Sequence, residues 1–309
     1  MSAYDCIVVG GGPAGLSAAL VLGRCRRRVL LCDAGRPRNR RARAIHGYLT
    51  RDGMPPADFL NSARAELARY PDVEPRTVEV RDAHRIEGGF EVELADSERC
   101  RGRTLLIATG VVDEIPALEG IDALYGNSVH HCPYCDGWEH RDQPIAAYGA
   151  DPATAGLALA LTQWSADVVW CSDGPARLDG DARGALASAG VGLREERVVR
   201  LEGHDGQLEV ICFDRGRPLP RRALFFDAGQ HQASVLALKL GAPLDDKGAV
   251  ATKKGERTGT RGLYVAGDAS KDAQLVVVAA AEGAQAAVAI NTELNRADLP
   301  IGRMEQAAE

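Results

Sequence analysis

A strand-turn-helix pattern near the start of the chain constrains the fold more than any other feature. An apolar run at residues 4–9 leads into the glycine-rich sequence GGGPAG at residues 10–15, and an alanine- and leucine-rich stretch follows. This order predicts a buried strand, a tight turn and a helix whose N-terminus faces a bound phosphate. Gly10 permits the turn, Gly12 lets the backbone approach a pyrophosphate, and Gly15 lets the helix pack closely on the strand. We therefore expect a Rossmann-type dinucleotide-binding unit here.

Three further signals belong to the same kind of domain. The next apolar run ends in Asp33, at the distance expected for a carboxylate that binds a ribose hydroxyl. Later strands are predicted to end in Thr109-Gly110 and in Gly267-Asp268, where glycine lets the chain pass close to a dinucleotide. Small residues from Gln274 to Ala289 predict a helix after the last of these strands.

The sequence HHCPYCDG places two thiols three residues apart. Cys132 and Cys135 at this spacing lie one turn apart on a helix, where they can form a disulfide, and the helix N-terminus stabilises a thiolate. His130, His131 and Asp136 flank the pair, and each is a candidate acid or base for proton transfer. The sequence does not decide among these three residues.

Two other interpretations use the same motif. A structural zinc site would combine the cysteines with His130, His131 or His140, but no second pair of Cys or His residues completes a tetrahedral site. A glutaredoxin-like module also uses Cys-Pro-Tyr-Cys, but such a module is a domain of its own. Here the motif lies between two nucleotide-binding signals, so a redox-active disulfide without a metal is favoured.

A second strand-turn-helix pattern, at residues 144–164, is an imperfect copy of the first. Asp151 stands where a pyrophosphate-binding turn would have its middle glycine, and Pro152 removes a backbone donor. The next strand, ending at Trp170, is not followed by arginines that would hold a 2′-phosphate. A carboxylate about 4 Å from a phosphate costs about 4 kcal/mol at an effective dielectric of about 20, so binding of NADPH is doubtful.

These signals predict an α/β protein with two Rossmann-like, three-layer nucleotide-binding domains. The 309 residues, 45% of them hydrophobic, suffice for two domains with cores of their own. Dinucleotide signals lie on both sides of the thiol motif, so the first domain is predicted to be discontinuous, at residues 1–114 and 243–309. Residues 115–242 are predicted to form an inserted domain that carries the thiols.

Charge and hydropathy argue against several classes of partner. The formal net charge of −6 argues against nucleic acid, and no run of about 18 apolar residues predicts a membrane span. The cysteines outside the motif have no framework spacing, as expected for reduced core thiols in the cytoplasm. They are Cys6, Cys25, Cys32, Cys100, Cys171 and Cys212.

Taken in order, the motifs resemble those of the low-molecular-weight thioredoxin reductases over nearly the whole chain. The shared motifs are GGGPAG at residues 10–15, Ala-Thr-Gly at 108–110, Cys-x-x-Cys-Asp-Gly at 132–137 and Gly-Asp at 267–268. Within that superfamily, the His46-Gly47 loop, the sequence CPYCDGWE and the altered second turn are more similar to the FAD-dependent dithiol oxidases of gliotoxin and holomycin biosynthesis.

The resemblance implies FAD as the cofactor, held mainly by the first domain. His46 is expected to line either the flavin or the entrance for the substrate. The implied cofactor-binding residues are Gly10, Gly12, Pro13, Ala14, Gly15, Asp33, His46, Thr109, Gly110, Gly267, Asp268, Gln274 and Leu275.

The resemblance also implies a catalytic cycle. A substrate thiolate attacks the disulfide at Cys132, a second substrate thiol releases the product, and electrons pass from Cys135 through FAD to oxygen. The substrate is then a small dithiol or a thioredoxin-like protein, and the chain is expected to form a homodimer. Two alternatives stay open: an NAD(P)H-dependent reductase of a protein disulfide, in which Asp173 selects NADH, and a flavin-binding redox sensor without turnover.

Overall fold

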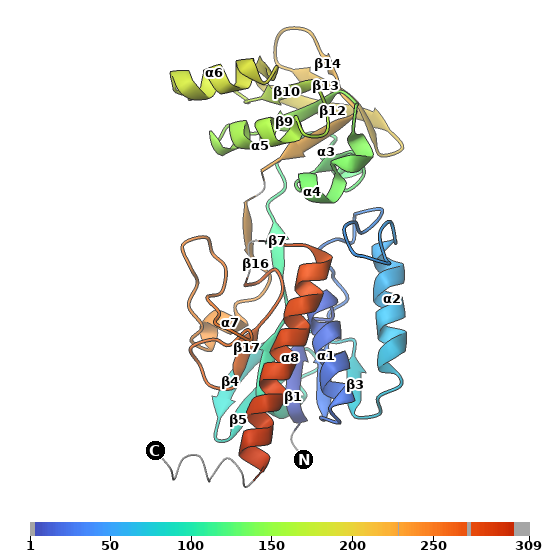
Figure 1. Ribbon diagram of the computed structural model, residues 1–309, viewed down its shortest axis with the longest axis vertical. Helices are drawn as coiled ribbons and strands as arrows, with labels where there is room; N and C mark the ends of the chain where they lie inside the picture. The colour runs from blue at the N-terminus through green and yellow to red at the C-terminus, as the bar shows by residue number, and fades with distance from the viewer. Residues whose placement is uncertain (1–3, 228, 271–272, 300–309) are drawn as a thin grey trace. The chain divides into compact units, whose positions relative to one another are not determined.

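The computed structural model describes residues 4–227, 229–270 and 273–299, which form two compact units (Figure 1). Within the described residues, the first unit holds 4–40, 57–112 and 231–299, and the second holds 41–56 and 113–230 apart from residue 228.

These divisions differ from the predicted domain limits in two places. Residues 41–56 pack with the second unit, and residues 231–242 pack with the first. Residues 41–56 were predicted to belong to the first domain, because dinucleotide-binding motifs lie on both sides of them in sequence. Their contacts are instead with the unit that carries the thiols. Residues 1–3 and 300–309 of the predicted first domain lie outside the described residues.

A seven-stranded sheet forms the first unit, in the order β3-β2-β1-β6-β5-β4, with β17 paired to the end of β6. The strands β1, β2, β3, β6 and β17 are parallel, as a Rossmann unit requires, whereas β4, β5 and the start of β6 form an antiparallel meander. The strand bounds are β1 Tyr4–Val9, β2 Val29–Cys32, β3 Val73–Arg76, β4 Val80–Ile86, β5 Gly89–Leu94, β6 Arg99–Ile107 and β17 Leu263–Val265.

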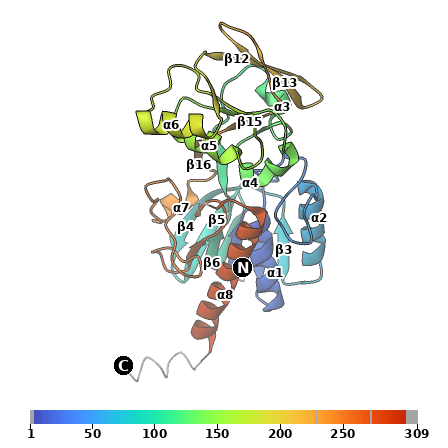
Figure 2. The same cartoon turned by 45° about the horizontal axis from the view of Figure 1, so that its top comes forward.

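Helices α1 and α8 lie side by side on one face of this sheet (Figures 1 and 2). Leu22 and Ile290 from these helices pack on Val8 and Leu106 of the sheet, and on the opposite face of the parallel strands, side chains of α7 and of β4 and β5 complete a second apolar cluster. The apolar stripe of α8 continues to Leu294, so this helix runs beyond the predicted end. The helix bounds are α1 Pro13–Arg24, α2 Pro56–Leu67, α7 Leu236–Lys239 and α8 Val276–Asp298.

The second unit has its own parallel sheet, in the order β11-β10-β9-β15-β8, and a three-stranded antiparallel sheet, β12-β13-β14. The bounds of the parallel strands are β8 Val129–His130, β9 Ile145–Tyr148, β10 Val168–Cys171, β11 Gly192–Arg194 and β15 Ala223–Phe226. Those of the antiparallel strands are β12 Val198–His204, β13 Gln207–Phe213 and β14 Leu219–Pro220.

Both faces of the parallel sheet in the second unit are covered. On one face, Leu161 of α5 and Leu186 of α6 pack against the buried Trp170, and on the other face α3, β12 and β13 enclose Phe226. The predicted α/β class with two three-layer units is therefore confirmed. The helix bounds are α3 Ile121–Leu124, α4 Pro133–Asp136, η1 Trp138–His140 (a 3-10 turn), α5 Ala153–Leu161 and α6 Gly180–Ser188.

Two short strands, β7 (Val111–Asp113) and β16 (Gln230–Gln232), pair with each other. The chain crosses from one unit to the other within these strands, at residues 112–113 and 230–231. The pairing therefore ties together two of the places where the chain changes unit.

Candidate redox site and nucleotide-binding turns

The thiol motif forms a disulfide at the start of a single helical turn. Cys132 and Cys135 are bonded, with their Cα atoms 5.3 Å apart, and Cys132 caps the four-residue helix α4. The backbone N–H of Cys135 donates a 3.1 Å hydrogen bond to the Cys132 sulfur. The predicted helix is thus only one turn long, so its macrodipole is small. When the disulfide is reduced, the local N–H, rather than a long helix, would stabilise negative charge on Cys132.

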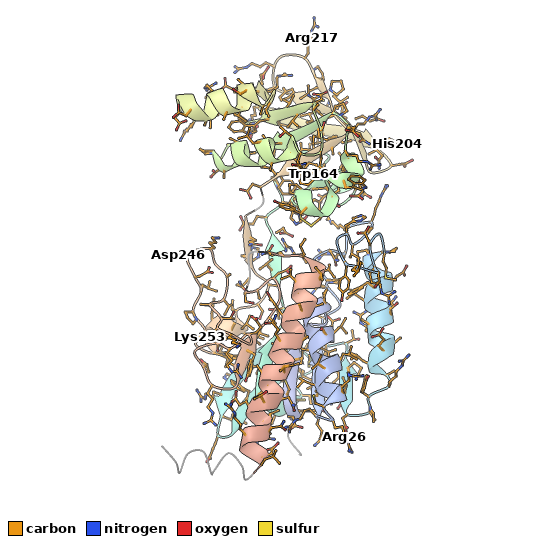
Figure 3. The ribbon with its side chains drawn as sticks, viewed as in Figure 1. Arg26, Trp164, His204, Arg217, Asp246 and Lys253 are labelled. Atoms are coloured by element: carbon orange, nitrogen blue, oxygen red, sulfur yellow. A yellow bond between two sulfur atoms is a disulfide. The ribbon has the colours of Figure 1, made fainter. Side chains whose placement is uncertain are left out.

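Exposed aromatic rings flank the disulfide. Tyr134, between the two cysteines, is 82% exposed, and Trp138, three residues after the second, is 64% exposed. Trp164, labelled in Figure 3, meets the Tyr134 ring edge-on at a centroid distance of 6.0 Å. The guanidinium of Arg141 lies 4.2 Å from the centroid of the Trp138 ring. Apolar surface of this kind beside a reactive disulfide suits contact with a substrate.

The two adjacent histidines point into different surroundings, because successive side chains of an extended segment face opposite ways. His130 is buried, with Nδ1 3.3 Å from Oδ2 of Asp136. His131 has its Nδ1 2.9 Å from the Tyr125 hydroxyl and its Nε2 4.0 Å from Oδ1 of Asp113. The structure therefore brings two of the three candidate acid-base residues together and holds His131 in a separate network.

His140 belongs to the same cluster, although sequence reasoning considered it only as a zinc ligand. Its Nε2 lies 3.0 Å from Nε2 of His130, and both rings are buried. Burial and the neighbouring His130 lower the pKa of His140 to about 4. No sequence signal identified this pairing, because a spacing of ten residues matches neither helical nor strand periodicity.

His46 was predicted among the cofactor-binding residues, but the structure places it in the second unit. Its Nε2 lies 3.7 Å from Oε1 of Glu139, next to the exposed Trp138, and its Nδ1 lies 3.6 Å from Oδ1 of Asp52. His46 therefore contacts the segment that follows the thiol motif. Glu139 was not predicted as a site residue.

The first nucleotide turn has the geometry that its glycines predict. Gly10 has a φ of 111°, and a Cβ at this position would lie 2.3 Å from the Ala108 carbonyl oxygen. A Cβ on Gly15 would lie 1.8 Å from the Gly10 carbonyl oxygen, so neither position accepts a side chain without movement of the backbone. Gly12 caps α1 without a side-chain hydrogen bond, with Pro13 next, and a Cβ there would meet no atom within 4 Å. The turn therefore leaves room and amide donors for a pyrophosphate.

A buried hydroxyl without a partner lies at the end of β6. Among the described residues, Thr109 Oγ1 is one of three buried side-chain atoms that have no hydrogen-bond partner. Gly110 has a φ of 69°, and a Cβ there would come within 4.0 Å of Asp268. An orphaned polar atom beside an open glycine turn is expected where a bound cofactor supplies the missing hydrogen bond.

Arg38 connects two predicted cofactor residues and was missed by sequence reasoning. Its Nη1 lies 2.8 Å from Oδ2 of Asp268 and donates a 2.6 Å hydrogen bond to Oε1 of Gln274. Leu275, the next residue, caps α8 without a side-chain hydrogen bond. The buried Glu282 of α8, also missed, accepts a 2.8 Å hydrogen bond from the Gly267 N–H. Arg38 lies in an arginine-rich stretch that the sequence presents as a solvated loop, which is why it did not stand out.

Asp33 stands at the end of β2, as predicted. Its Oδ1 accepts a 3.0 Å hydrogen bond from the Gly35 N–H, and its Oδ2 accepts one of 3.0 Å from Arg64 of α2. A Cβ on Gly11 would lie 2.4 Å from Oδ2 of Asp33, so the carboxylate lies directly against the first nucleotide turn. This position suits a carboxylate that binds a ribose hydroxyl.

The second nucleotide turn differs from the first at its helix start. Oδ1 of Asp151 accepts a 2.8 Å hydrogen bond from the Ala153 N–H, and Pro152, which has no N–H, precedes α5. The Thr154 hydroxyl is buried, and a Cβ on Gly149 would lie 2.6 Å from its oxygen. The chain's own carboxylate therefore occupies the position of an anion at this helix N-terminus.

The carboxylate of Asp173, which follows β10, accepts hydrogen bonds from residues of its own unit. Its Oδ2 accepts a 3.2 Å hydrogen bond from the Tyr148 hydroxyl, and its Oδ1 accepts one of 2.8 Å from the Val198 N–H. Ser172 beside it is buried and bonds to the carbonyl of Gly174. Both oxygens of the Asp173 carboxylate thus hold the loop in place.

The cysteines outside the motif are free, and all but one are buried. Burial raises the pKa of Cys6, Cys32 and Cys171 to about 12, which makes these thiols inert at neutral pH. Cys25, at the end of α1, is exposed, so the prediction of a core thiol is wrong at this position. Its arginine neighbours in sequence signalled an exposed helix end, not a core.

Within the part of the chain that the structure describes, no helix is long and apolar enough to cross a membrane. In the same residues, no group of three or more His, Cys, Asp or Glu side chains is arranged to hold a metal ion.

Known proteins resemble the chain over nearly its full length. Residues 4–283 match the family model described as pyridine nucleotide-disulphide oxidoreductase. A protein of Arthroderma benhamiae named "Probable thioredoxin reductase" is 30% identical, with 98% of this chain and 84% of the relative aligned.

Two solved structures extend the likeness to three dimensions. HlmI is 35% identical with a TM-score of 0.93, over 99% of this chain and 96% of HlmI. The putative thioredoxin reductase TrxB of Bacillus anthracis is 31% identical with a TM-score of 0.90, over 96% of this chain and 100% of TrxB. The resemblance inferred from the sequence motifs is confirmed.

Proposed function

The chain belongs to the pyridine nucleotide-disulphide oxidoreductase family, and from that premise we propose that it is an FAD-dependent enzyme that oxidises a dithiol to a disulfide. Its general chemistry, thiol-disulfide oxidoreduction, follows from the family and from the Cys132–Cys135 disulfide. The direction of electron flow is the proposed part: substrate thiols reduce the disulfide, and the electrons leave through FAD to oxygen.

FAD is the cofactor that this family binds, and the first nucleotide turn fits it. The open N-terminus of α1 at Gly12 would hold the pyrophosphate, and Asp33 would accept hydrogen bonds from the ribose hydroxyls. Thr109 Oγ1 and the carboxylate of Asp268 would hydrogen-bond the flavin portion. When bound, FAD supplies a two-electron acceptor that oxygen can reoxidise.

The observation that carries the proposal is the hydrogen bond from the Ala153 N–H to Asp151, which fills the second nucleotide turn. A nicotinamide dinucleotide would have to displace this carboxylate or bring its pyrophosphate against it. At a separation of about 4 Å and an effective dielectric of about 20, the repulsion costs about 4 kcal/mol. That is roughly three decades of affinity, and Pro152 removes a further donor. NADPH is therefore a poor electron source in this proposal.

The alternative in which Asp173 selects NADH is less favourable. A carboxylate that selects NADH binds the free ribose hydroxyls of the nucleotide. Both oxygens of Asp173 instead accept hydrogen bonds from Tyr148 and Val198 within the second unit. Binding of a ribose at Asp173 would compete with the bonds that order its loop.

In the proposed cycle, a substrate thiolate attacks Cys132 and displaces the sulfur of Cys135. The second substrate thiol then attacks the mixed disulfide, releases the product disulfide and leaves both enzyme cysteines reduced. The Cys135 N–H stabilises the charge that returns to the Cys132 sulfur in this second step. The substrate thus loses two electrons and two protons, and we assign the proton transfer to Asp136 and His130, whose side chains lie 3.3 Å apart beside the motif in sequence.

A turnover experiment tests the proposed function. Purified flavoprotein with dithiothreitol in aerated buffer is expected to consume one oxygen and form one hydrogen peroxide per disulfide, and the Cys132→Ser variant is expected to do neither. Replacement of the dithiol by NADPH is expected to give no oxygen consumption. Rapid NADPH-dependent reduction of a protein disulfide would establish the reductase alternative, and a single reduction without turnover would establish the sensor.

We also propose that the chain is a homodimer, because the resemblance to thioredoxin reductases implies that state. Light scattering at micromolar protein is expected to give a mass of two chains. A single-chain mass at that concentration would contradict this part of the proposal.

A further inference from the structure

The residues that would hold FAD follow one another along a single edge of the first unit's sheet. The parallel strands β2, β1, β6 and β17 pair in that order, so their carboxyl ends meet at the same edge. Asp33 follows β2, and the first nucleotide turn follows β1. Thr109 and Asp268 come after β6 and β17. A dinucleotide with a ribose at Asp33 and its pyrophosphate at the turn would therefore extend its other end, which in FAD is the flavin, toward Thr109 and Asp268.

The turn that carries Asp268 packs against the first nucleotide turn. A Cβ on Gly267 would lie 3.0 Å from the Cβ of Ala14, the second residue of α1, and a Cβ on Gly110 would lie 4.0 Å from that of Asp268. The Gly267 N–H donates a 2.8 Å hydrogen bond to the buried Glu282 of α8. Asp268 is thereby held where the start of α1, the end of β6 and α8 come together.

Arg38 reaches this place from the loop that follows Asp33. One guanidinium nitrogen, Nη1, lies 2.8 Å from Oδ2 of Asp268 and donates a 2.6 Å hydrogen bond to Oε1 of Gln274. Because a guanidinium only donates hydrogen bonds, the Gln274 amide must turn its oxygen toward Arg38. Gln274 directly precedes Leu275, the N-cap of α8. Arg38 thus joins the carboxylate of Asp268 to the start of α8.

The pair of Arg38 and Asp268 is more shielded from water than a second ion pair of the same loop. Its two side chains are 18% and 20% exposed. Arg36, two residues earlier, lies 2.8 Å from Glu79, but those side chains are 65% and 54% exposed. Water and salt screen exposed charges, whereas partly buried charges act more strongly on a neighbouring group. The charge of Arg38 is therefore expected to affect a bound cofactor more than the charge of Arg36.

We propose that Arg38 is a positioning residue of the flavin site that neutralises the Asp268 carboxylate and thereby makes the bound flavin easier to reduce. Reduction of a flavin at neutral pH adds two electrons and one proton, so the flavin gains one negative charge. A carboxylate without its cation would repel this charge, whereas the neutral pair of Arg38 and Asp268 does not. The inference rests on the proposed FAD-dependent function, and it deepens it, because a flavin that is easier to reduce accepts electrons from a dithiol more readily.

Three variants separate the charge of Arg38 from its hydrogen bonds. Arg38→Gln removes the charge but retains an amide that can donate to Asp268. Arg38→Lys retains the charge, and because both bonds of Arg38 leave one nitrogen, a single ammonium with its three donors can replace them. Arg36→Gln is the matched control, since it removes the same charge from the same loop at the exposed pair with Glu79. Thermal unfolding of each variant checks that the fold is retained.

The reduction potential of the bound flavin is the main readout. It is measured without oxygen, by equilibration with a dye of known potential, in a Cys132→Ser background that lacks the disulfide. Arg38→Gln is expected to lower the equilibrium constant for flavin reduction by on the order of tenfold, which is about 30 mV for a two-electron couple. Arg38→Lys and Arg36→Gln are expected to keep the potential of the parent protein. A residue that only anchored the loop would change the thermal unfolding and leave the potential unchanged.

The affinity of the FAD-free protein for FAD, followed by flavin fluorescence, is the second readout. Arg38→Gln removes the charged donor that orients Asp268 and Gln274, so we expect its affinity to fall by on the order of tenfold. Arg38→Lys is expected to restore most of this loss, and Arg36→Gln is expected to bind FAD as the wild type does.

Three results would overturn the inference. The first is an unchanged flavin potential in Arg38→Gln, the second is a potential in Arg38→Lys as low as in Arg38→Gln, and the third is an equal decrease in the control Arg36→Gln. Neither readout uses a dithiol, oxygen or a nicotinamide nucleotide. A protein that shows the expected potentials but oxidises no dithiol would therefore refute the proposed function and leave the role of Arg38 standing.

Discussion

The backbone N–H of Ala153 donates a 2.8 Å hydrogen bond to the side chain of Asp151, two residues earlier, at the start of α5. At the corresponding place in the first unit, α1 begins at Gly12 with no side-chain cap and with open space around the glycine. One helix N-terminus is therefore available to a phosphate, and the other is already bonded to a carboxylate of the chain itself. This difference favours one bound dinucleotide, FAD, over two.

Substitution of Asp151 is expected to raise affinity for NADPH. Asp151→Asn removes the negative charge but retains an oxygen for the Ala153 N–H, whereas Asp151→Gly removes both the charge and the cap. We expect affinity to increase from the wild type to Asp151→Asn to Asp151→Gly, by up to about three decades in total. Titration of each protein with NADPH by calorimetry measures this order. Micromolar NADPH binding by the wild type would contradict the prediction.

Substitution of Gly12 and of Gly15 by alanine is expected to have different effects on stability and on FAD binding. Gly15→Ala would place a Cβ 1.8 Å from the Gly10 carbonyl oxygen, so we expect a loss of stability of about 1–3 kcal/mol or more together with loss of FAD. Gly12→Ala meets no protein atom within 4 Å, so the FAD-free chain is expected to melt as the wild type does while its FAD affinity falls. Thermal melts and flavin titrations distinguish the two. Normal FAD binding by Gly12→Ala would show that the pyrophosphate lies elsewhere.

The two cysteines are expected to behave differently toward substrate. In Cys135→Ser, the thiol of Cys132 remains beside the residue 135 N–H and is expected to form a stable mixed disulfide when treated with an activated thiol. The matched variant Cys132→Ser leaves a thiol that lacks this hydrogen bond and is expected to be labelled more slowly. Mass spectrometry of the trapped species measures both. Faster trapping on Cys135 than on Cys132 would reverse the assigned roles.

Acid is expected to destabilise the fold through His140. The pKa of His140 is about 4 when folded and 6.5 when unfolded, so between these values the unfolded chain takes up a proton that the folded chain does not. The free energy of unfolding should therefore fall as pH drops from 6.5 to 4, by at most about 3.4 kcal/mol, and this loss should level off below pH 4.

The variant His140→Gln isolates this contribution. Urea unfolding between pH 7 and pH 4 is expected to show a smaller decrease for His140→Gln than for the wild type. Below pH 3.8 the two proteins are expected to lose stability in parallel, because Arg103 and Arg27 lower the pKa of Asp298 to about 2 in both. If the free energy of unfolding decreased equally in the wild type and in His140→Gln between pH 7 and pH 4, His140 would not be the cause of the acid destabilisation.

The sequence predicted the fold well in the segments where buried strands lead into glycine-rich turns. A side chain at Gly10 or Gly15 would clash with the backbone, so only glycine fits this turn. The glycine pattern in the sequence therefore predicts the turn directly. The discontinuous arrangement was also anticipated, but residues 41–56 were assigned to the wrong unit. Their arginines and polar residues carry no period, and their position depends on contacts such as that of Arg41 with Asp122.

The candidate site was predictable in its sulfur chemistry but not in its proton chemistry. Cys132 and Cys135 are close because they are close in sequence, whereas His140 meets His130 only because the chain turns through α4 and a 3-10 turn. Arg38 was missed for the same reason, since its partner Asp268 lies 230 residues away. Contacts of this kind depend on tertiary packing, which no local pattern encodes.

Anaerobic reduction of the purified flavoprotein tests the proposed electron flow most directly. The oxidised protein is mixed rapidly with NADPH, NADH or dithiothreitol in excess, and the loss of flavin absorbance is followed. We expect bleaching with the dithiol that disappears in Cys132→Ser, and little or none with either nicotinamide nucleotide. Complete bleaching within seconds by stoichiometric NADPH or NADH, with slow or absent bleaching by the dithiol, would contradict the oxidase proposal.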